Sequence, residues 1–284
     1  MPDRFTPSRR HETWLTLPSL LWMAVFFAVP ALNLFLISFR PAEVSGDVGQ
    51  GWTTDAWRVF AEPGYQELLL RTLGMSLATM VGCVILALPA SWFILRAAPS
   101  SRPWLLLALV LPFWTSFLVR VFSWRALLQS SGPVATLLTD LGLLEDGGML
   151  LYNSYVVVLV MIYTCLPLAV LPLHAAMEKF DFGTYEAARD LGAGPLRAFW
   201  SVVVPSVRGG IVAACLLVGV PSLGSYVVPE MVGGVDAEML GSKIGQRLFS
   251  DRNLPEAAAL ASGLALVAMP LVWLSLRRRK EELS

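Results

Sequence analysis

Six long apolar runs alternate with shorter polar segments along the chain. Each run is close to the roughly 20 residues that an α-helix needs to cross a hydrocarbon core about 30 Å thick. Five of the runs contain no charged residue, whereas the third contains Arg120 near one end, with Arg125 just beyond it. The pattern therefore predicts an all-α membrane protein with six transmembrane helices. The predicted spans lie near residues 17–39, 73–95, 104–124, 150–173, 211–228 and 257–276.

Basic residues are distributed unevenly among the polar segments. If the N-terminus faces the cytoplasm, the inner segments hold 13 of the 21 Lys and Arg residues, and the outer segments and helix ends hold the other 8. The inner stretch 96–103 carries two Arg and no acid, whereas the outer stretch 126–149 carries three acids and no base. Because cytoplasmic loops carry an excess of Lys and Arg, both termini are predicted to be cytoplasmic.

Composition supports a lipid environment. Hydrophobic residues make up 56% of the chain and charged residues 15%, against roughly 25% charged in a soluble domain. The mean hydropathy is +0.63 and the formal net charge is zero. These values exclude a disordered chain, and also a nucleic-acid binder that relies on bulk positive charge. The three cysteines lie inside apolar runs without C-x-x-C spacing, so no metal cluster is predicted.

The polar segment between the fourth and fifth spans predicts two short helices joined at a glycine corner. Thr184 is a suitable N-cap for a helix over residues 185–191, which ends at Gly192 because glycine readily adopts the left-handed conformation of a helix C-terminus. Pro195 then opens a second helix. Spacing of i, i+3, i+4, i+7 and i+8 gives this second helix one apolar stripe. The stripe consists of Leu196, Phe199, Trp200, Val203 and Val204.

This loop resembles a motif of the permease subunits of binding-protein-dependent ABC importers, in which Glu-Ala-Ala, three residues, Gly and nine residues precede Ile-x-Leu-Pro. Here Glu186, Ala187 and Ala188 are followed at those spacings by Gly192 and Pro205, with conservative apolar changes in the last element. The resemblance implies that residues 184–205 form the loop that couples the permease to a cytoplasmic ATPase, and that these five residues carry the coupling.

The resemblance extends over nearly the whole chain and is to the spermidine/putrescine-type branch of the family. It is carried by the segments 18–22, 111–120, 166–172 and 221–230. It implies a type I ABC importer permease fold in which residues 1–284 form a single transmembrane domain of the bacterial inner membrane. A polyamine such as spermidine or putrescine is the solute that it implies first. Since some polyamine permeases carry an acidic residue where this chain has Ser225, another small organic solute or a metal complex is the alternative.

The same resemblance implies the partners. They are a cytoplasmic ABC ATPase dimer, a second, related permease that forms a heterodimer with this chain, and a periplasmic solute-binding protein. The chain has only three lysines, Lys179, Lys243 and Lys280, and none follows a glycine, so the phosphate-binding sequence G-x-x-x-x-G-K-[ST] is absent. We therefore expect no enzyme activity and no bound cofactor in this chain, with ATP and Mg²⁺ held by the partner ATPase.

Polar side chains within the spans are candidates for the translocation path, because such groups need either a partner or water inside a membrane. In the fifth span, helix packing by small residues is the alternative reading. In the fourth span the alternative is hydrogen bonding between helices. The candidates are Ser222, Gly224, Ser225, Tyr226, Asn153 and Tyr155.

Arg120 and Arg125 lie at the predicted outer end of the third span, where two explanations compete. Arginine side chains near helix ends extend toward lipid headgroups. Direct contact with substrate or with the binding protein is the second explanation. The two histidines, His11 and His174, lie in no catalytic or metal-ligating motif and are expected to be ordinary surface or loop residues.

Two different classes of membrane protein are the rivals of an ABC permease. A secondary transporter driven by an ion gradient usually shows acids inside its spans or an internal repeat, and neither is found in this sequence. An intramembrane enzyme needs catalytic His, Asp or Ser groups at workable spacing, but five of the spans contain neither charge nor histidine. Co-purification with an ATPase separates these readings.

Overall fold

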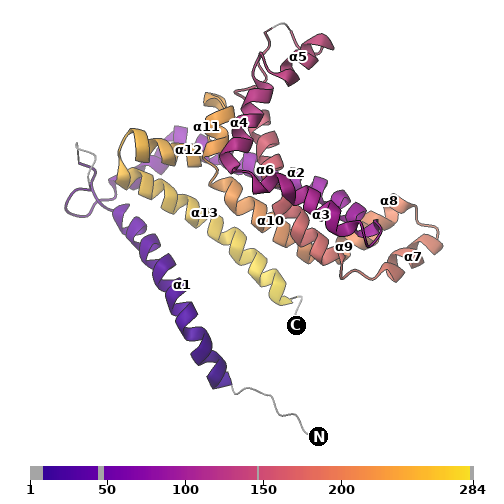
Figure 1. Cartoon of the computed structure of the whole chain (residues 1–284). Coiled ribbons are helices and arrows are strands. Elements are labelled where there is room, and N and C mark those ends of the chain that lie inside the picture. The colour runs from indigo at the N-terminus through magenta and orange to yellow at the C-terminus, as the bar shows by residue number, and fades with distance from the viewer. Residues whose placement is uncertain (1–8, 44–47, 146, 282–284) are drawn as a thin grey trace. The chain divides into compact units, whose positions relative to one another are not determined.

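The computed structural model describes residues 9–43, 48–145 and 147–281, and the regular secondary structure in this part of the chain is helical, apart from one isolated bridge between Ala42 and Val48. Figure 1 shows the elements in chain order. The α-helical part of the prediction is confirmed. The longer helices are α1 (Arg9–Ile37), α2 (Pro63–Arg96), α6 (Ser154–Met177), α10 (Arg208–Leu223) and α13 (Leu254–Glu281). The shorter ones are η1 (Asp55–Ala61), α3 (Arg102–Val110), η2 (Leu111–Trp114), α4 (Phe117–Leu128), α5 (Pro133–Asp140), α7 (Phe182–Asp190), α8 (Pro195–Ala198), the π-helix η3 (Phe199–Val203), α9 (Val204–Ser206), α11 (Val227–Val232), η4 (Val235–Ala237), α12 (Leu240–Gly245) and the π-helix η5 (Gln246–Ser250).

Contacts divide the chain into two compact units. Unit 1 comprises Met1–Glu62 and Gln246–Gly263, and unit 2 comprises Pro63–Gly245 and Leu264–Ser284. The candidate coupling loop and all candidate path residues belong to unit 2.

The core of unit 2 is formed by α2, α6 and α10, which pack against one another. Small residues allow the close approach. A Cβ atom on Gly210 of α10 would lie 2.5 Å from the Cβ of Ala176 in α6, and Ala87 and Ala214 are completely buried. Because lipid is as apolar as a leucine side chain, such packing of small residues, rather than a hydrophobic driving force, holds membrane helices together.

The third apolar run does not form the continuous helix that was predicted over residues 104–124. It forms α3 and η2, then a break, then α4, and the axes of Arg102–Trp114 and Phe117–Asp140 differ by 87°. Pro112 cannot donate a backbone hydrogen bond, and Thr115 and Ser116 adopt extended conformations with ψ near 155° and 138°. These residues end the helix where apolar spacing alone suggested that it continues.

The fifth run also differs from the prediction of a helix over residues 211–228. Residues Pro195–Ser206 and α10 meet at a 73° bend at Val207. Helix α10 ends at Leu223, and a turn in which the amide of Ser225 donates to the carbonyl of Ser222 separates it from α11. Gly224 caps α10 in this turn.

Three helices of the described chain are long and apolar enough to cross a membrane, namely the stretch Thr16–Ile37 of α1, α2 and α6. The number rises to five if each bent pair is one span. The sixth predicted span corresponds to α13, in which Leu254–Pro270 is a shorter apolar helix. Six spans and cytoplasmic termini therefore stay predictions.

In unit 1, aromatic side chains connect the end of α1 to η1. The indole of Trp57 stacks on Phe39 with 5.5 Å between ring centroids, and its Nε1 donates to the hydroxyl of Ser38 at 3.1 Å. Phe60 occupies the space above Gly263, where a Cβ atom would clash with its ring. None of the apolar window of α1 is buried, so this helix presents its whole apolar surface to its surroundings.

Candidate functional site

The first helix of the coupling loop begins earlier than predicted. The carboxylate of Asp181, rather than the hydroxyl of Thr184, caps α7, because it accepts a hydrogen bond from the amide of Gly183 at 2.9 Å. Thr184 lies in the first turn and donates its own hydroxyl to the carbonyl of Asp181 at 2.7 Å. The prediction of Thr184 as N-cap was therefore wrong by three residues, and the helix runs over Phe182–Asp190.

The glycine corner that follows α7 has the predicted geometry. Gly192 has a φ of 87°, which glycine adopts without the steric strain of a Cβ atom. The amide of Gly192 donates to Arg189, and the amide of Ala193 donates to Ala188, both at 3.0 Å. This pair of bonds is a Schellman motif, which satisfies the last carbonyls of the helix and fixes the direction of the chain as it leaves α7.

The residues of the matching motif lie largely on the surface of this corner. Glu186, Ala187 and Pro205 are exposed, and Ala188 is half-buried. Glu186 forms no ion pair with any described residue of the chain. At the end of the same corner, Leu191 exposes 90% of its surface.

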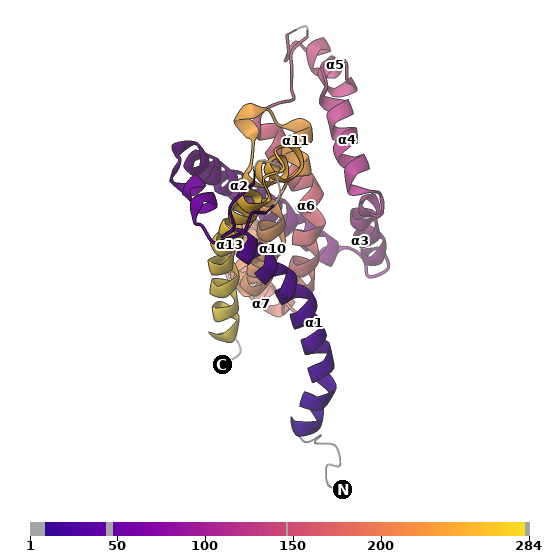
Figure 2. The same ribbon diagram turned by 90° about the vertical axis from the view of Figure 1, so that its left-hand side faces the viewer.

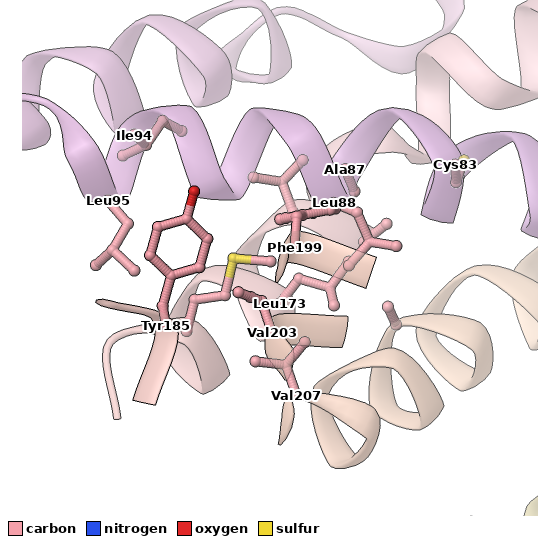
Figure 3. Close-up of a cluster of buried hydrophobic side chains, with 14 of the residues drawn as sticks. Cys83, Ala87, Leu88, Ile94, Leu95, Leu173, Tyr185, Phe199, Val203 and Val207 are labelled. Carbon is pink, nitrogen blue, oxygen red and sulfur yellow. The ribbon is translucent and has the colours of Figure 1, made fainter. Parts of the chain in front are cut away.

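An aromatic cluster anchors the corner to the end of α2. Trp92 of α2 lies 5.1 Å from Tyr185 and 5.6 Å from both Phe182 and Phe199, measured between ring centroids. Figure 3 shows Tyr185 and Phe199 pointing into the buried cluster alongside Leu95 and Leu88 of α2. These contacts fix α7 to a long apolar helix. The anchor was not predicted, although the i, i+3 spacing of Phe182 and Tyr185 indicates one inward face of α7.

The apolar stripe predicted on the second helix is only partly correct. Phe199 and Val203 are buried, but Leu196 and Trp200 expose 70% and 54% of their surfaces. The stretch Phe199–Val203 is a π-helix, and the buried positions here are 198, 199, 203 and 207. The side chains of Leu196 and Trp200 add to the exposed apolar surface of the loop.

The candidate path residues of the fifth span lie in the turn between α10 and α11. Ser222 is buried, and its hydroxyl donates to the carbonyl of Gly219 at 2.9 Å. Gly224 is exposed, Ser225 is half-buried, and Tyr226 exposes 38% of its surface. The structure thus brings these residues together where the helix is interrupted, with polar backbone groups in an apolar segment.

Two glycines of α12 shape this turn and were missed in the sequence. A Cβ atom on Gly241 would lie 2.3 Å from the carbonyl oxygen of Ser225, and one on Gly245 would lie 2.5 Å from the ring of Tyr226. The spacing Gly-x-x-x-Gly, which permits close approach between membrane helices, was the available signal.

The candidates of the fourth span lie at the start of α6. Asn153 caps this helix, since its side-chain oxygen accepts from the amide of Val156 at 3.0 Å and its nitrogen donates to the carbonyl of Leu150 at 2.7 Å. Tyr155 exposes 88% of its surface. At the other end of α6, His174 is 5% exposed and therefore is not the surface or loop residue that was predicted, because the helix continues to Met177.

The coupling corner and the interrupted turn lie at opposite ends of α6. Figure 1 and Figure 2 both show α7 near one end of this helix and α11 near the other, and the amide of Tyr152 just before α6 donates to Val232 of α11. A helix of 24 residues is about 36 Å long, which exceeds the thickness of a hydrocarbon core. The two groups of candidates are thus separated by roughly one membrane thickness.

Arg120 does not extend away from the protein as the headgroup explanation assumed. Its guanidinium carbon lies 4.2 Å from the ring centroid of Phe113, and the atoms Nε and Nη1 are buried without a hydrogen-bond partner among the described residues. Arg125, one turn along α4, is exposed, and its Nη1 lies 4.0 Å from the sulfur of Met231.

Known proteins give independent information on the family. The family described as the binding-protein-dependent transport system inner membrane component matches residues 8–278. The spermidine/putrescine transport system permease protein PotB of Escherichia coli (strain K12) is 32% identical to the chain over 246 residues, which cover 87% of this chain and 90% of that protein. The protein of the same name from Haemophilus influenzae is 31% identical over 259 residues, or 91% of each chain.

Solved structures show that the fold is shared. A bacterial ABC transporter involved in the import of the acidic polysaccharide alginate matches with a TM-score of 0.70 at 16% identity, covering 95% of this chain and 96% of that chain. The alginate transporter in complex with its pentasaccharide-bound periplasmic protein matches with a TM-score of 0.69 at 18% identity, covering 93% of each chain. This chain therefore belongs to the family of inner membrane components of binding-protein-dependent transport systems, as a multi-pass permease subunit of an ABC importer.

Proposed function

We propose that residues 182–205 form the element through which a cytoplasmic ATPase dimer moves this permease. The observation that carries the proposal is the rigid corner at Gly192, which presents Glu186 and Leu191 to the surroundings while Tyr185 fixes α7 to the end of α2. The exposed side of the corner binds the ATPase and its buried side moves the membrane helices.

The chemistry of the corner defines the groove that would receive it. Glu186 pairs with a basic side chain of the ATPase, since a carboxylate buried in an interface needs an opposite charge. Leu191, Leu196 and Trp200 supply apolar surface that an interface would remove from water. Gly192 keeps the corner tight, and Ala187 and Ala188 let the groove approach the helix backbone. Pro205 ends the loop at the bend before α10.

The proposed topology has six spans with both termini in the cytoplasm. It rests on the distribution of basic residues and on the separation of the two candidate groups along α6. The coupling corner then lies on the inner side, and the interrupted turn at 224–226 lies toward the outer side. Closure of the ATPase dimer rocks the spans between inward-facing and outward-facing states, as in other transporters with alternating access.

We propose that the turn formed by Ser222, Gly224, Ser225 and Tyr226 lines the translocation path, with Asn153 and Tyr155 at the outer end of α6. Interrupted membrane helices are found where backbone groups line a cavity or a binding site. The solute is a polyamine such as spermidine or putrescine, delivered by a periplasmic binding protein. This follows from the PotB relatives, which are named as spermidine/putrescine permeases and which this chain matches over most of their length. A second, related permease completes the path.

The test is to express the permease with its ATPase and its second permease, and to measure how much ATPase co-purifies. Glu186→Lys reverses the exposed charge, and Gly192→Val places a branched side chain at a φ of 87°, which costs about 1–3 kcal/mol. We expect at least a tenfold loss of bound ATPase in both variants, with unchanged membrane insertion. Asp140→Asn, at an exposed acid on α5, is the matched control and keeps the ATPase.

Uptake into vesicles tests the solute and the energy source. With the binding protein and ATP, we expect accumulation of labelled spermidine that continues when ion gradients are collapsed with an uncoupler. If accumulation stops when the ion gradients are collapsed and does not depend on ATP, the protein acts as a secondary transporter and the proposal is wrong. Wild-type ATPase recovery and wild-type uptake in both corner variants would contradict the coupling role.

A further inference from the structure

A cavity of about 380 Å³ lies in unit 1, and its walls come from the residues after α1, from η1 and from the segment that leads into α13. Its volume is within the range of 300–1,000 Å³ that is typical of ligand pockets. The lining includes three basic and three acidic residues, namely Arg40, Arg58, Arg247, Asp55, Glu62 and Glu256. Since charged side chains are costly inside a hydrocarbon core, this cavity lies outside it.

The cavity lies on the outer side of the membrane in the topology proposed above. Arg40 follows the first span, Glu62 directly precedes α2, and Asn253 directly precedes α13. When both termini are cytoplasmic, the end of the first span and the beginnings of the second and sixth spans all face outward. The cavity is therefore on the side from which a periplasmic protein approaches.

Hydrogen bonds and ion pairs hold the charged walls of the cavity. Arg247 donates from Nε to one carboxylate oxygen of Glu256 at 2.8 Å, and the side-chain amide of Asn253 donates to the other oxygen, also at 2.8 Å. In η1, Nη1 of Arg58 lies 3.1 Å from a carboxylate oxygen of Asp55. The wall formed by Arg247 and Glu256 is thus ordered before a partner arrives, which lowers the entropy that binding costs.

Two charged side chains of the cavity, Arg40 and Glu62, form no ion pair with any residue that the structure describes. The guanidinium carbon of Arg40 lies 4.9 Å from the ring centroid of Trp52, which exposes 67% of its surface. Arginine and tryptophan are enriched among the residues that dominate the binding energy of protein interfaces. This edge of the cavity therefore has the composition of a protein-binding surface.

We propose that this cavity and Trp52 form a docking site for the periplasmic solute-binding protein, an inference that rests on the importer function proposed above. Charges of both signs favour a protein partner, because a protein surface can place an acid against Arg40 and a base against Glu62. A polyamine carries charge of one sign only, and the three arginines of the cavity oppose the attraction of its three acids. Docking at this site would bring the delivered solute to the outer ends of the first and sixth spans.

The test measures how tightly the solute-loaded binding protein binds the whole importer in lipid nanodiscs, by surface plasmon resonance. Arg40→Glu and Glu62→Arg reverse the two charges that lack an ion pair, and we expect each to weaken binding about tenfold. Trp52→Ala should weaken it about fivefold. Asp140→Lys is the matched control and should bind as the wild type does, because Asp140 is an exposed acid of α5 that does not line the cavity.

Transport separates loss of docking from a general structural defect. In Arg40→Glu and Glu62→Arg, the concentration of binding protein that gives half-maximal solute uptake should rise about tenfold, whereas the maximal rate and the amount of bound ATPase stay at wild-type values. If a charge reversal does not assemble, Arg40→Gln and Glu62→Gln keep the test decisive, with an expected rise of about threefold.

Binding of wild-type strength by both charge reversals overturns the docking site and leaves the importer function intact. Equal weakening by Asp140→Lys also overturns it, because the effect would then belong to the outer surface as a whole. If the binding protein does not bind the wild-type importer, the docking site and the proposed delivery of the solute both fail. Thermal stabilisation of the importer by spermidine alone, lost in Glu62→Arg, would assign the cavity to the solute and overturn docking.

Discussion

Two apolar segments of this permease bend sharply, and they do so in opposite surroundings. At the 73° bend before α10, Val203 and Val207 are almost completely buried. At the 87° bend before α4, Val119 and Phe117 expose 57% and 40% of their surfaces, and a cavity adjoins the break. The first bend is filled by side chains of its own chain, whereas the second leaves space and an unsatisfied charge.

The difference teaches what each bend can do. Packed interiors have low compressibility and transmit displacement, so the filled bend suits a coupling element that must move as one body. In the coupling role proposed above, the buried side chains of the bend before α10 would carry the displacement of α7 to the membrane helices, whereas the bend before α4 leaves space beside Arg120.

The largest effect is expected from removing the aromatic side chain that anchors the coupling corner to α2. Trp92→Ala removes the ring that contacts Phe182, Tyr185 and Phe199, and truncation of a packed aromatic residue costs about 3–5 kcal/mol. We expect the ATPase to remain bound, because Glu186 and Leu191 are unchanged, while solute imported per ATP hydrolysed falls about tenfold. The measurement is simultaneous uptake and ATP hydrolysis in proteoliposomes.

Phe93→Ala is the matched control for that experiment. Phe93 is the next residue on α2 and exposes 67% of its surface, so it is outside the aromatic cluster. We expect wild-type coupling from this variant. If both substitutions lower the solute imported per ATP equally, the loss does not depend on the aromatic cluster. That result would contradict the anchoring role of Trp92.

A smaller effect is expected from overfilling the same region. A side chain at Gly210 meets the Cβ of Ala176 at 2.5 Å and the carbonyl of Pro172 at 3.2 Å, so Gly210→Val separates α10 from α6. Overpacking of this kind costs about 1–3 kcal/mol. The measurement is the thermal unfolding midpoint of the purified importer. Gly74→Val in α2, where nothing lies within 4 Å of a Cβ atom, should leave that midpoint within error of the wild type.

Local signals allowed the sequence to predict the corner but not its register. Gly192 was predicted because a helix C-terminus needs a left-handed residue, and that requirement depends only on neighbouring residues. The N-cap was misplaced because Asp181 and Thr184 are both suitable caps, and only the fold selects between them. The stripe from Leu196 to Val204 was wrong in part because Leu196 and Trp200 face away from the core, and spacing alone does not show which positions the fold covers.

The 87° bend before α4 could not be predicted from the composition of the third apolar run. Residues 104–124 carry no charge apart from Arg120, and prolines are tolerated in membrane helices, so Pro112 alone did not indicate a break. The extended backbone at Thr115 and Ser116 and the missing acceptor for Arg120 are tertiary facts. The spacing of Gly241 and Gly245 indicates a close approach between helices. It does not indicate that the segment approached is the turn at Ser225 and Tyr226.

The smallest effect compares the same substitution at the two bends. Val203→Ala leaves a void in the filled bend, where Val203 is completely buried, and we expect a cost of about 1–2 kcal/mol. Val119→Ala trims an exposed side chain beside the open bend and should cost less than about 0.5 kcal/mol. Thermal unfolding of the two variants in one detergent measures the difference. Equal midpoints would mean that the bends before α10 and α4 are packed alike and that the contrast in packing between them does not exist.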